Sequence, residues 1–164
     1  MTYKPFGHLR PLTLADARQV LEWRNSDHVR KYMVTQDIIP WENHLKWVTK
    51  VIQTPESYRY FIYEADGHPL GVIGFYGFDE NKTSAEWGLY IGDENAPKGA
   101  GESMCRLALD WFFYEFKGEI LETFARKTNA KAIALYQKLG FIPIDKSDKN
   151  HQYMRLSRQM WPKK

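Results

Sequence analysis

One stretch near the middle of the chain, residues 84–116, constrains the fold more than any other. Residues 84–91 (SAEWGLYI) have the composition of a strand, and an amphipathic helix follows a turn that contains Gly99 and Gly101. Glycine carries no side chain, so its backbone can approach a ligand closely. The first N–H groups of the following helix are free and lie at the positive end of its dipole. The stretch therefore predicts a strand–turn–helix unit that binds an anion, commonly a phosphate.

Hydrophobic periodicity predicts an α/β (α+β) fold class. Apolar residues recur at helical spacing in the first third of the chain. β-Branched and aromatic residues then dominate around an Asp66-Gly67 turn, which is typical of a β-hairpin. We therefore expect a mixed sheet with helices on its faces, within a single domain over residues 1–164. The expected strands cover residues 6–12, 58–64, 70–78, 84–91, 119–125, 141–144 and 152–156, and the expected helices cover residues 14–24, 28–33, 41–53, 101–117 and 130–139.

The bulk composition limits the classes of function. The chain has 164 residues, of which 43% are apolar and 15% aromatic, and this suits one globular domain with a sizeable core. The net charge is only +3 and no long basic block occurs, which argues against a nucleic-acid partner. Cys105 is the single cysteine, so no intrachain disulfide can form. No leader or membrane-spanning run is evident, and we expect a cytoplasmic protein without a membrane partner.

A second motif lies in the last third of the chain. Asn129, Ala132, Tyr136, Gly140 and Phe141 follow the pattern Asn-x-x-Ala-x-x-x-Tyr-x-x-x-Gly-Phe. Together with the glycine turn, this motif resembles the Gcn5-related N-acetyltransferase (GNAT) family over nearly the whole chain. The resemblance implies a mostly antiparallel seven-stranded sheet whose fourth and fifth strands splay apart around a thioester. It also implies acetyl-CoA as the co-substrate, and no metal.

The resemblance implies that the coenzyme lies along the glycine turn and the second motif. The family's loop usually begins with Arg or Gln, where this chain has Ala96. The loop would then rely on backbone donors, on Lys98 and on Ser103 to bind the pyrophosphate. The residues that we expect to bind the coenzyme are Leu89, Tyr90, Ile91, Lys98, Gly99, Ala100, Gly101, Glu102, Ser103, Asn129, Ala132 and Tyr136.

Amide formation from an amine and a thioester defines three catalytic tasks. The amine must lose a proton, the carbonyl oxygen needs a donor as it becomes negative, and the departing thiolate benefits from an acid. The resemblance implies that Tyr136 is the acid, although spacing alone favours a half-buried packing residue. Glu86 and His44 compete for the role of base, and each could instead be an ordinary surface residue. The backbone N–H groups of residues 89–92 are candidate oxyanion donors, because the family has a bulge there.

The N-terminal half is informative about the acceptor amine. Trp-Arg-Asn at 23–25, Glu-x-His-Leu at 42–45 and Glu-x-Gly-Leu-Tyr at 86–90 resemble a branch of the family in pseudaminic acid biosynthesis. That branch acetylates the 4-amino group of a UDP-linked 4-amino-4,6-dideoxy sugar. Arginines could bind the diphosphate and aromatic rings could stack on the uracil, whereas core packing and helix-end charge are the alternatives. The candidate substrate-binding residues are Trp23, Arg24, Asn25, Arg30, Tyr32, His44 and Tyr90.

Two other functions stay open at the level of sequence. One is a GNAT enzyme that acts on a protein N-terminus, which needs an open groove, or on an aminoglycoside, which favours an acidic cleft. The other is a non-catalytic module that only binds coenzyme A. The expected partners are acetyl-CoA and a small-molecule UDP-amino sugar, and the chain could form a homodimer.

Overall fold

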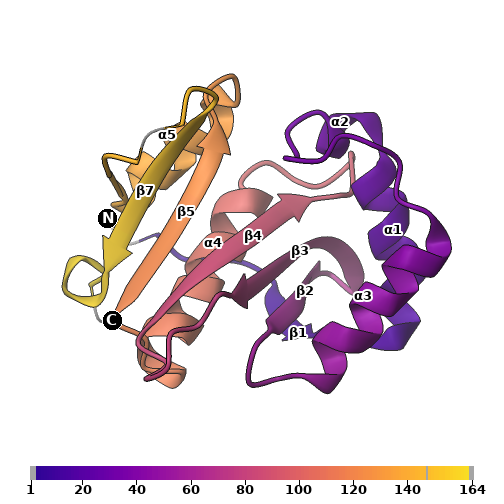
Figure 1. Cartoon of the computed structure of the whole chain (residues 1–164), viewed down its shortest axis with the longest axis horizontal. Helices are drawn as coiled ribbons and strands as arrows, with labels where there is room; N and C mark the ends of the chain where they lie inside the picture. The colour runs from indigo at the N-terminus through magenta and orange to yellow at the C-terminus, as the bar shows by residue number, and fades with distance from the viewer. Residues whose placement is uncertain (1–2, 147, 163–164) are drawn as a thin grey trace.

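A seven-stranded sheet forms the centre of the molecule (Figure 1). The computed structural model describes residues 3–146 and 148–162; residues 1–2, 147 and 163–164, which belong to the expected domain 1–164, lie outside the described part. The strand order is β1-β2-β3-β4-β5-β7-β6, and only the pair β4–β5 is parallel. The strands are β1 (His8–Pro11), β2 (Arg59–Ala65), β3 (His68–Tyr76), β4 (Ser84–Ile91), β5 (Ile120–Arg126), β6 (Ile142–Pro143) and β7 (His151–Ser157).

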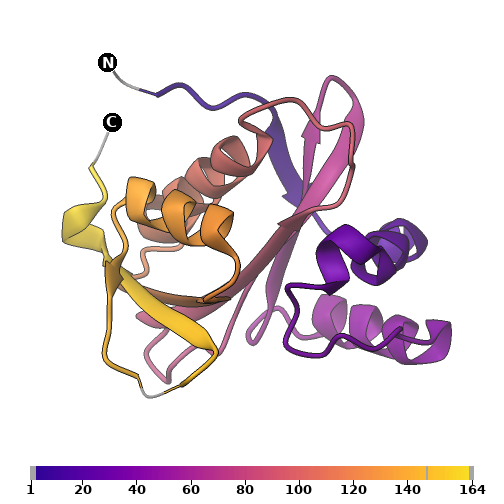
Figure 2. The ribbon, with the colours of Figure 1, turned by 90° about the horizontal axis from the view of Figure 1, so that it is seen from above.

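Helices cover both faces of the sheet, as Figure 2 shows from above, with α1 and α3 on one side and α4 and α5 on the other. The helical elements are η1 (Leu14–Asp16), α1 (Ala17–Asn25), α2 (Asp27–Arg30), α3 (Trp41–Gln53), α4 (Ala100–Asp110), η2 (Trp111–Glu115), α5 (Ala130–Leu139) and η3 (Arg158–Met160). No helix in the described part of the chain is both long enough and apolar enough to cross a membrane.

Strand alternation divides the interior into two hydrophobic cores. Successive side chains of a strand point to opposite faces, so Val72 packs with Val20 and Val48 beneath α1 and α3. Its neighbour Ile73 packs on the other face with Leu109 of α4. The sheet therefore separates two packed layers, and a residue on β4 faces one or the other according to its position.

The sheet opens between β4 and β5. Their parallel pairing covers only Ser84–Glu86 against Ile120–Glu122, and β5 continues beside β7 alone. At the point of divergence the indole ring of Trp87 lies 5.9 Å from the ring of Tyr136 and 5.4 Å from that of Phe141. Side chains of α5 and of the residues that end it therefore pack where the hydrogen-bonded pairing of β4 with β5 would otherwise continue. The expected splay between the fourth and fifth strands is confirmed.

Most expected elements are present, and three (41–53, 84–91 and 130–139) have the expected bounds. The helix expected over residues 101–117 instead ends at Asp110 and continues as the π-helical turn η2. Aromatic crowding accounts for this difference, because the ring of Phe116 stacks on those of Trp111 and Phe112 at 5.2 and 5.8 Å. A looser turn accommodates this stack of rings.

Candidate active site

The turn before α4 presents free backbone donors. Gly99 has a positive φ of 88°, a conformation that favours glycine, and the helix begins at the next residue. The N–H of Ala100 donates to the Pro97 carbonyl at 3.1 Å, and that of Ser103 donates to the Gly99 carbonyl at 2.9 Å. Among the described residues, the N–H groups of Gly101 and Glu102 have no acceptor. Free N–H groups at the start of a helix commonly bind anions, and these two are available for that role.

The space above these donors is open. A Cβ atom added to Gly101 would lie 3.8 Å from Ile91 on β4 and 3.9 Å from Leu135 on α5, which is ordinary contact. The exposed Lys98 precedes the turn. The turn therefore combines a nearby cation with an unobstructed backbone, and binding of a diphosphate by Lys98, Gly99, Ala100 and Gly101 stays a prediction.

The carboxylate of Glu102 would repel an anion at this helix end, but cations hold it. Arg106 Nε donates to it at 2.9 Å and Lys138 Nζ at 2.7 Å. Burial alone would raise the pKa of Glu102, but these hydrogen bonds outweigh it and lower the pKa. Glu102 can therefore contact a ligand through its backbone N–H, while its charge is compensated behind the turn.

The structure corrects the expectation for Ser103. Its side chain is fully buried, and its Oγ lies 2.7 Å from the Tyr3 hydroxyl and accepts from the Phe6 N–H at 3.2 Å. Because its own N–H belongs to the helix ladder, Ser103 offers no donor to a ligand. The residue instead fastens the N-terminal segment to α4.

Ladder hydrogen bonds show which way the backbone of β4 faces. The N–H of Gly92 donates to Leu70 at 2.9 Å on the β3 side, and the Thr83 carbonyl accepts from Ile120 at 3.0 Å on the β5 side. Peptide groups alternate between the two neighbours of a strand. The backbone N–H and C=O groups of even-numbered β4 residues therefore bond to β3, and those of odd-numbered residues point towards β5.

This alternation leaves open backbone groups where the sheet splays. The peptide groups of Leu89 and Ile91 face β5 beyond the last β4–β5 pair, so they point into the splay. The register between β3 and β4 is regular from residue 86 to residue 91, so the bulge that the family resemblance implied there is absent. The open donors come from the splay itself. Tyr90, also expected to bind the coenzyme, bonds through its backbone to β3 instead.

The second motif lies on the other wall of the splay. Asn129 caps α5, and its Oδ1 accepts from the Ala132 N–H at 3.2 Å. Two turns further along, Tyr136 is only 5% exposed and packs on Trp87 and Phe141. Burial raises the pKa of Tyr136, and a hydrogen bond with Thr123 offsets this only in part. The phenol therefore keeps its proton at neutral pH and can act as a donor.

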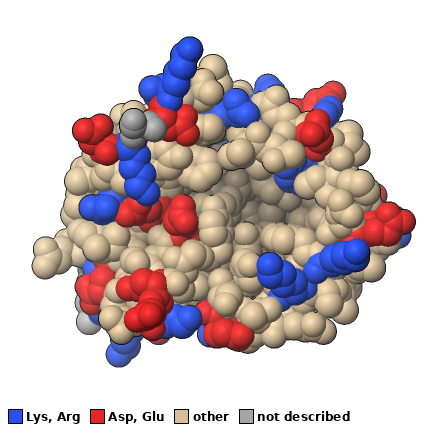
Figure 3. Space-filling view, viewed as in Figure 1, with Lys and Arg blue, Asp and Glu red and all other residues tan. Residues whose placement is uncertain are grey.

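A cavity of about 500 Å³ lies on the opposite side of β4, between the sheet and α1 and α3. Figure 3 shows the hollow near the middle of this face. Aromatic side chains, those of Trp47, Tyr60, Tyr76 and Tyr90, line it, and Gly88 leaves room at its floor. Of these, only Tyr90 was expected, because periodicity alone does not tell which face of a strand or helix meets a ligand.

Arg24 is an expected residue that reaches this cavity. Its Nη2 donates to the Thr35 carbonyl at 2.7 Å, whereas its Nη1 is buried and has no hydrogen-bond partner among the described residues. Burial lowers the pKa of Arg24, and the nearby Tyr90 opposes this. An unpaired buried donor of this kind is costly, by about 1–3 kcal/mol or more for a charged group. A ligand that offers an acceptor to Nη1 would remove the cost.

His44 also lines the cavity, but one ring nitrogen is committed. Its Nε2 lies 2.8 Å from the Ala17 carbonyl, so the neutral ring carries its proton there and leaves Nδ1 as the free acceptor. Burial lowers the pKa of His44, against the smaller opposing effect of this hydrogen bond. The ring is packed between Trp41 and Trp47. His44 therefore joins α3 to α1 as well as facing the ligand space.

Glu86 lies at the edge of the same face of β4. It pairs with Tyr76 across the β3–β4 ladder, and its Oε2 would lie 2.9 Å from a Cβ atom added to Gly77. Burial raises the pKa of Tyr76, and the nearby Glu86 carboxylate raises it further. Glu86 and Tyr76 thus form a carboxylate–phenol pair beside the cavity, and the sequence indicated only the first of the two.

Two expected substrate ligands lie elsewhere. Trp23 is buried in the core, and a Cβ atom added to Gly92 would lie only 2.0 Å from its indole. Tyr32 is 37% exposed and stacks with the Lys31 ammonium 5.0 Å from its ring. Neither ring lines the cavity, so neither can stack on a base that is bound inside it. This result corrects the expectation for Trp23 and Tyr32.

Asn25 and Arg30 also depart from the expectation, because the side chain of each bonds to backbone groups of the segment that follows α2. The Asn25 amide donates to the Ile39 carbonyl and accepts from the Ile39 N–H, at 3.0 and 2.9 Å. Arg30 donates to the Gln36 carbonyl at 3.1 Å and forms an ion pair with Asp27. These contacts position the segment 31–40, and neither side chain lines the cavity.

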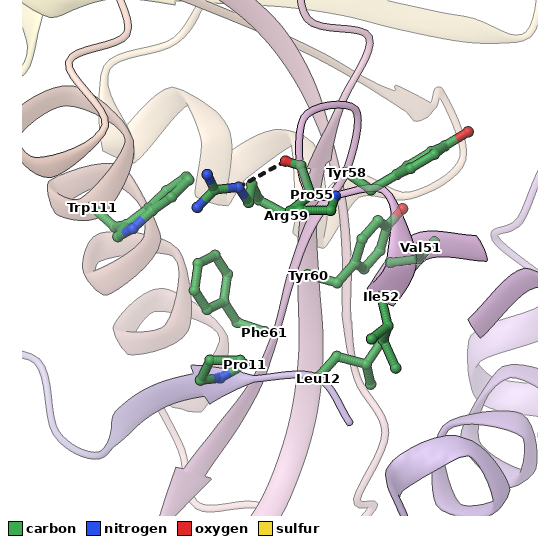
Figure 4. A pocket seen from close by; sticks show the side chains of 10 residues that line it. All are labelled: Pro11, Leu12, Val51, Ile52, Pro55, Tyr58, Arg59, Tyr60, Phe61 and Trp111. Atoms are coloured by element: carbon green, nitrogen blue, oxygen red, sulfur yellow. Dashed lines mark hydrogen bonds between the residues drawn. The ribbon is translucent and has the colours of Figure 1, made fainter. Parts of the chain in front are cut away.

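A second cavity, of about 410 Å³, lies between the end of α3 and η2 (Figure 4). Arg59 is the charged residue in its lining. Its Nε donates to the Pro55 carbonyl at 2.8 Å, and its guanidinium lies 5.9 Å from the Trp111 ring. No carboxylate or imidazole occurs among its lining residues, all of which belong to the described chain. It therefore lacks a base for amine chemistry. No group of three potential metal ligands occurs among the described residues either.

The splay and the cavity define the class of protein. Open amides and a turn with free N–H groups lie on one side of β4, and a largely apolar, aromatic cavity lies on the other, an arrangement that suits a two-substrate group transferase. The chain belongs to the GNAT acetyltransferase family, since the model of the acetyltransferase (GNAT) domain matches residues 8–142.

Curated relatives and solved structures agree with this membership. Acetyltransferase PseH of Campylobacter jejuni (strain 81-176) is 30% identical, over 85% of this chain and 84% of that protein. Spermidine N(1)-acetyltransferase of Escherichia coli (strain K12) is also 30% identical, over 81% of this chain and 71% of that protein. The crystal structure of C. jejuni PseH has a TM-score of 0.72 and 26% identity, covering 93% of this chain and 99% of the other.

Proposed function

We propose that this enzyme transfers the acetyl group of acetyl-CoA to the 4-amino group of a UDP-linked 4-amino-4,6-dideoxy sugar of pseudaminic acid biosynthesis. Acetyl-CoA, when bound, supplies the reactive thioester. The free N–H groups of Gly101 and Glu102, together with Lys98, would hold its pyrophosphate. The open carbonyl of Leu89 and the open peptide group of Ile91 would pair with the amides of its extended arm.

The residues around the splay divide the chemistry among them. The amine, bound in the cavity beyond Gly88, would give its proton to Glu86, which lies on the same face of β4. The Leu89 N–H points into the splay and would stabilise negative charge on the acyl oxygen. Tyr136, held neutral by burial, would protonate the thiolate. His44 would shape the cavity and orient the acceptor through Nδ1.

The observation that carries the choice of acceptor is the buried, unpaired Nη1 of Arg24 in the cavity wall. A phosphate or a sugar hydroxyl can accept from this guanidinium, whereas a polycation would be repelled by it. The spermidine acetyltransferase relative makes a polyamine the natural competitor, and Arg24 argues against it. An aminoglycoside is disfavoured for the same reason. A cytoplasmic location and a homodimer stay predictions.

The test is release of free thiol from acetyl-CoA with a panel of amines: the UDP-4-amino sugar, spermidine, an aminoglycoside and a basic peptide. We expect release with the UDP-sugar alone. Arg24→Met should raise the acceptor KM by about tenfold or more, equivalent to the loss of one charge-assisted hydrogen bond. Release with spermidine or the aminoglycoside would overturn the proposed acceptor, and coenzyme binding without turnover would indicate a non-catalytic module.

A further inference from the structure

The segment between α2 and α3, residues 31–40 (the acceptor loop), forms part of the cavity wall through Met33 and Ile39. It contains no helix or strand, and side chains hold its backbone. Arg24, Asn25 and Arg30 do so from the α1–α2 side, as described above. Loops without a ladder of their own open easily, so the position of Met33 depends on such contacts.

One further contact reaches the acceptor loop from the other half of the sheet. Arg126, the last residue of β5, donates from Nε and Nη2 to the Met33 carbonyl at 3.1 and 3.0 Å. Its Nη2 also lies 3.4 Å from the Val34 carbonyl. The fork of the guanidinium fixes direction as well as distance. Arg126 therefore bridges the acceptor loop and the strand that forms one wall of the splay.

Arg126 is also tied to the coenzyme side. Its carbonyl accepts from the N–H of Asn129 at 2.8 Å, in the turn that begins α5. At this position β5 has no ladder to β4, because their pairing ends at residue 122. A ligand that fills the splay and orders this end of β5 would thus act on the acceptor loop through one side chain.

We propose that Arg126 is a positioning residue for the acceptor: it holds Met33 in the cavity wall and makes the order of the acceptor loop depend on coenzyme binding. This inference rests on the proposed function, because it takes the splay as the coenzyme site. The guanidinium bonds exposed or half-buried carbonyls that water can also satisfy. Its loss should therefore affect acceptor binding far more than global stability.

Hydrogen exchange measured with and without coenzyme A tests the coupling independently of the acceptor. Arg126→Met keeps the stem and removes the donors; Arg155→Met, on the neighbouring strand with its ion pair to Glu122, is the matched control. Coenzyme A should slow exchange at residues 98–103 in all proteins. It should slow exchange in residues 31–40 in the wild type and the control by about tenfold, but not in Arg126→Met.

Each outcome has a definite reading. Equal protection of residues 31–40 in Arg126→Met and the wild type would overturn the role of Arg126. Absence of protection at 98–103 in the wild type would overturn the proposed coenzyme site, and this inference with it. Protection at 98–103 but not at 31–40 in the wild type would overturn the coupling alone.

Steady-state kinetics with the UDP-4-amino sugar provide the second readout. Arg126→Met should raise the acceptor KM by about tenfold, with the acetyl-CoA KM and the melting temperature close to those of Arg155→Met. Arg126→Lys, which keeps the charge but loses the fork, should lie between the two. An equal rise in both KM values, or no change in either, would contradict a positioning role.

Discussion

At the scale of single residues, burial decides what several side chains can do. Tyr136 is an ordinary phenol in the sequence, but it lies between Trp87 and Phe141 at the opening of the sheet, so it stays protonated. Arg24 is unusual for the opposite reason, because it keeps a charge and an unpaired donor in a buried wall. Each residue has the state that the proposed reaction needs.

Tyr136→Phe isolates the hydroxyl, since the ring and its packing are retained. We expect kcat to fall by about 10²- to 10⁴-fold, the usual contribution of a general acid, because the thiolate would leave without a proton. The dissociation constant for acetyl-CoA should stay within about twofold. Stopped-flow thiol release and calorimetry measure the two quantities. Unchanged turnover would remove Tyr136 from the mechanism.

His44 makes the stability of the protein sensitive to acid. Its folded-state pKa lies below the unfolded value of 6.5, so protonation favours the unfolded chain. Stability is therefore intact above pH 6.5 and falls as the pH decreases from there towards the folded-state pKa. His44→Gln, whose amide can still donate to Ala17, should reduce this loss.

Urea unfolding at a series of pH values between 5 and 8 measures this effect. His68→Gln, at the exposed start of β3, is the matched control and should keep the wild-type pH dependence. An identical slope in His44→Gln and the wild type would show that His44 is not responsible.

At the scale of elements, the sequence predicted α3, β4 and α5 with their bounds, because proline and glycine flank them and their periodicity is clear. It did not predict the end of α4, since the ring stack in η2 is a packing effect that no local signal reports. The turn before α4 was predicted from Gly99 and Gly101, and its binding of an anion stays a prediction. The lining of the cavity was predicted only in part: Arg24, His44 and Tyr90 line it, whereas Asn25 and Arg30 bond to the loop 31–40, whose path the sequence does not specify.

Strand β4 offers a direct test of the cavity at Gly88. A Cβ atom there would meet only a Tyr76 carbon at 3.6 Å, so Gly88→Val should fold normally and fill the floor of the cavity. We expect kcat/KM for the acceptor to fall by about a hundredfold, because the amine would be displaced from the thioester. Binding of coenzyme A, measured by calorimetry, should be unchanged.

The glycine opposite Gly88 supplies the contrast. A Cβ atom on Gly74 would lie 2.1 Å from the ring of Tyr60, so Gly74→Ala should lower the melting temperature even though it is the smaller change. If Gly88→Val destabilised the protein as much as Gly74→Ala, or left acceptor turnover intact, the cavity would not be the acceptor site.

At the scale of the whole molecule, the two proposed ligand sites lie on opposite sides of one strand, so both substrates could be present together. Direct transfer requires no nucleophile on the protein. Cys105 is the only cysteine and is fully buried, and burial raises the pKa of its thiol. It is therefore unsuited to carry an acyl group, as its packing role in the sequence suggests.

We accordingly expect sequential kinetics. Plots of reciprocal rate at several fixed acetyl-CoA concentrations should intersect, and Cys105→Ala should keep turnover within about threefold of the wild type, apart from a packing cost to stability. Parallel lines, which indicate a covalent enzyme intermediate, would contradict direct transfer. Mass spectrometry after incubation with acetyl-CoA alone gives an independent check for an acetylated protein.

The alternation along β4 has a consequence for how such enzymes diversify. The coenzyme would be read by main-chain groups of odd-numbered positions, which any residue except proline supplies. The acceptor would be contacted by the side chains of even-numbered positions, among which are Gly88 and Tyr90. Selection can therefore exchange one amine for another by replacing alternate residues, while the donor half of the reaction is inherited unchanged.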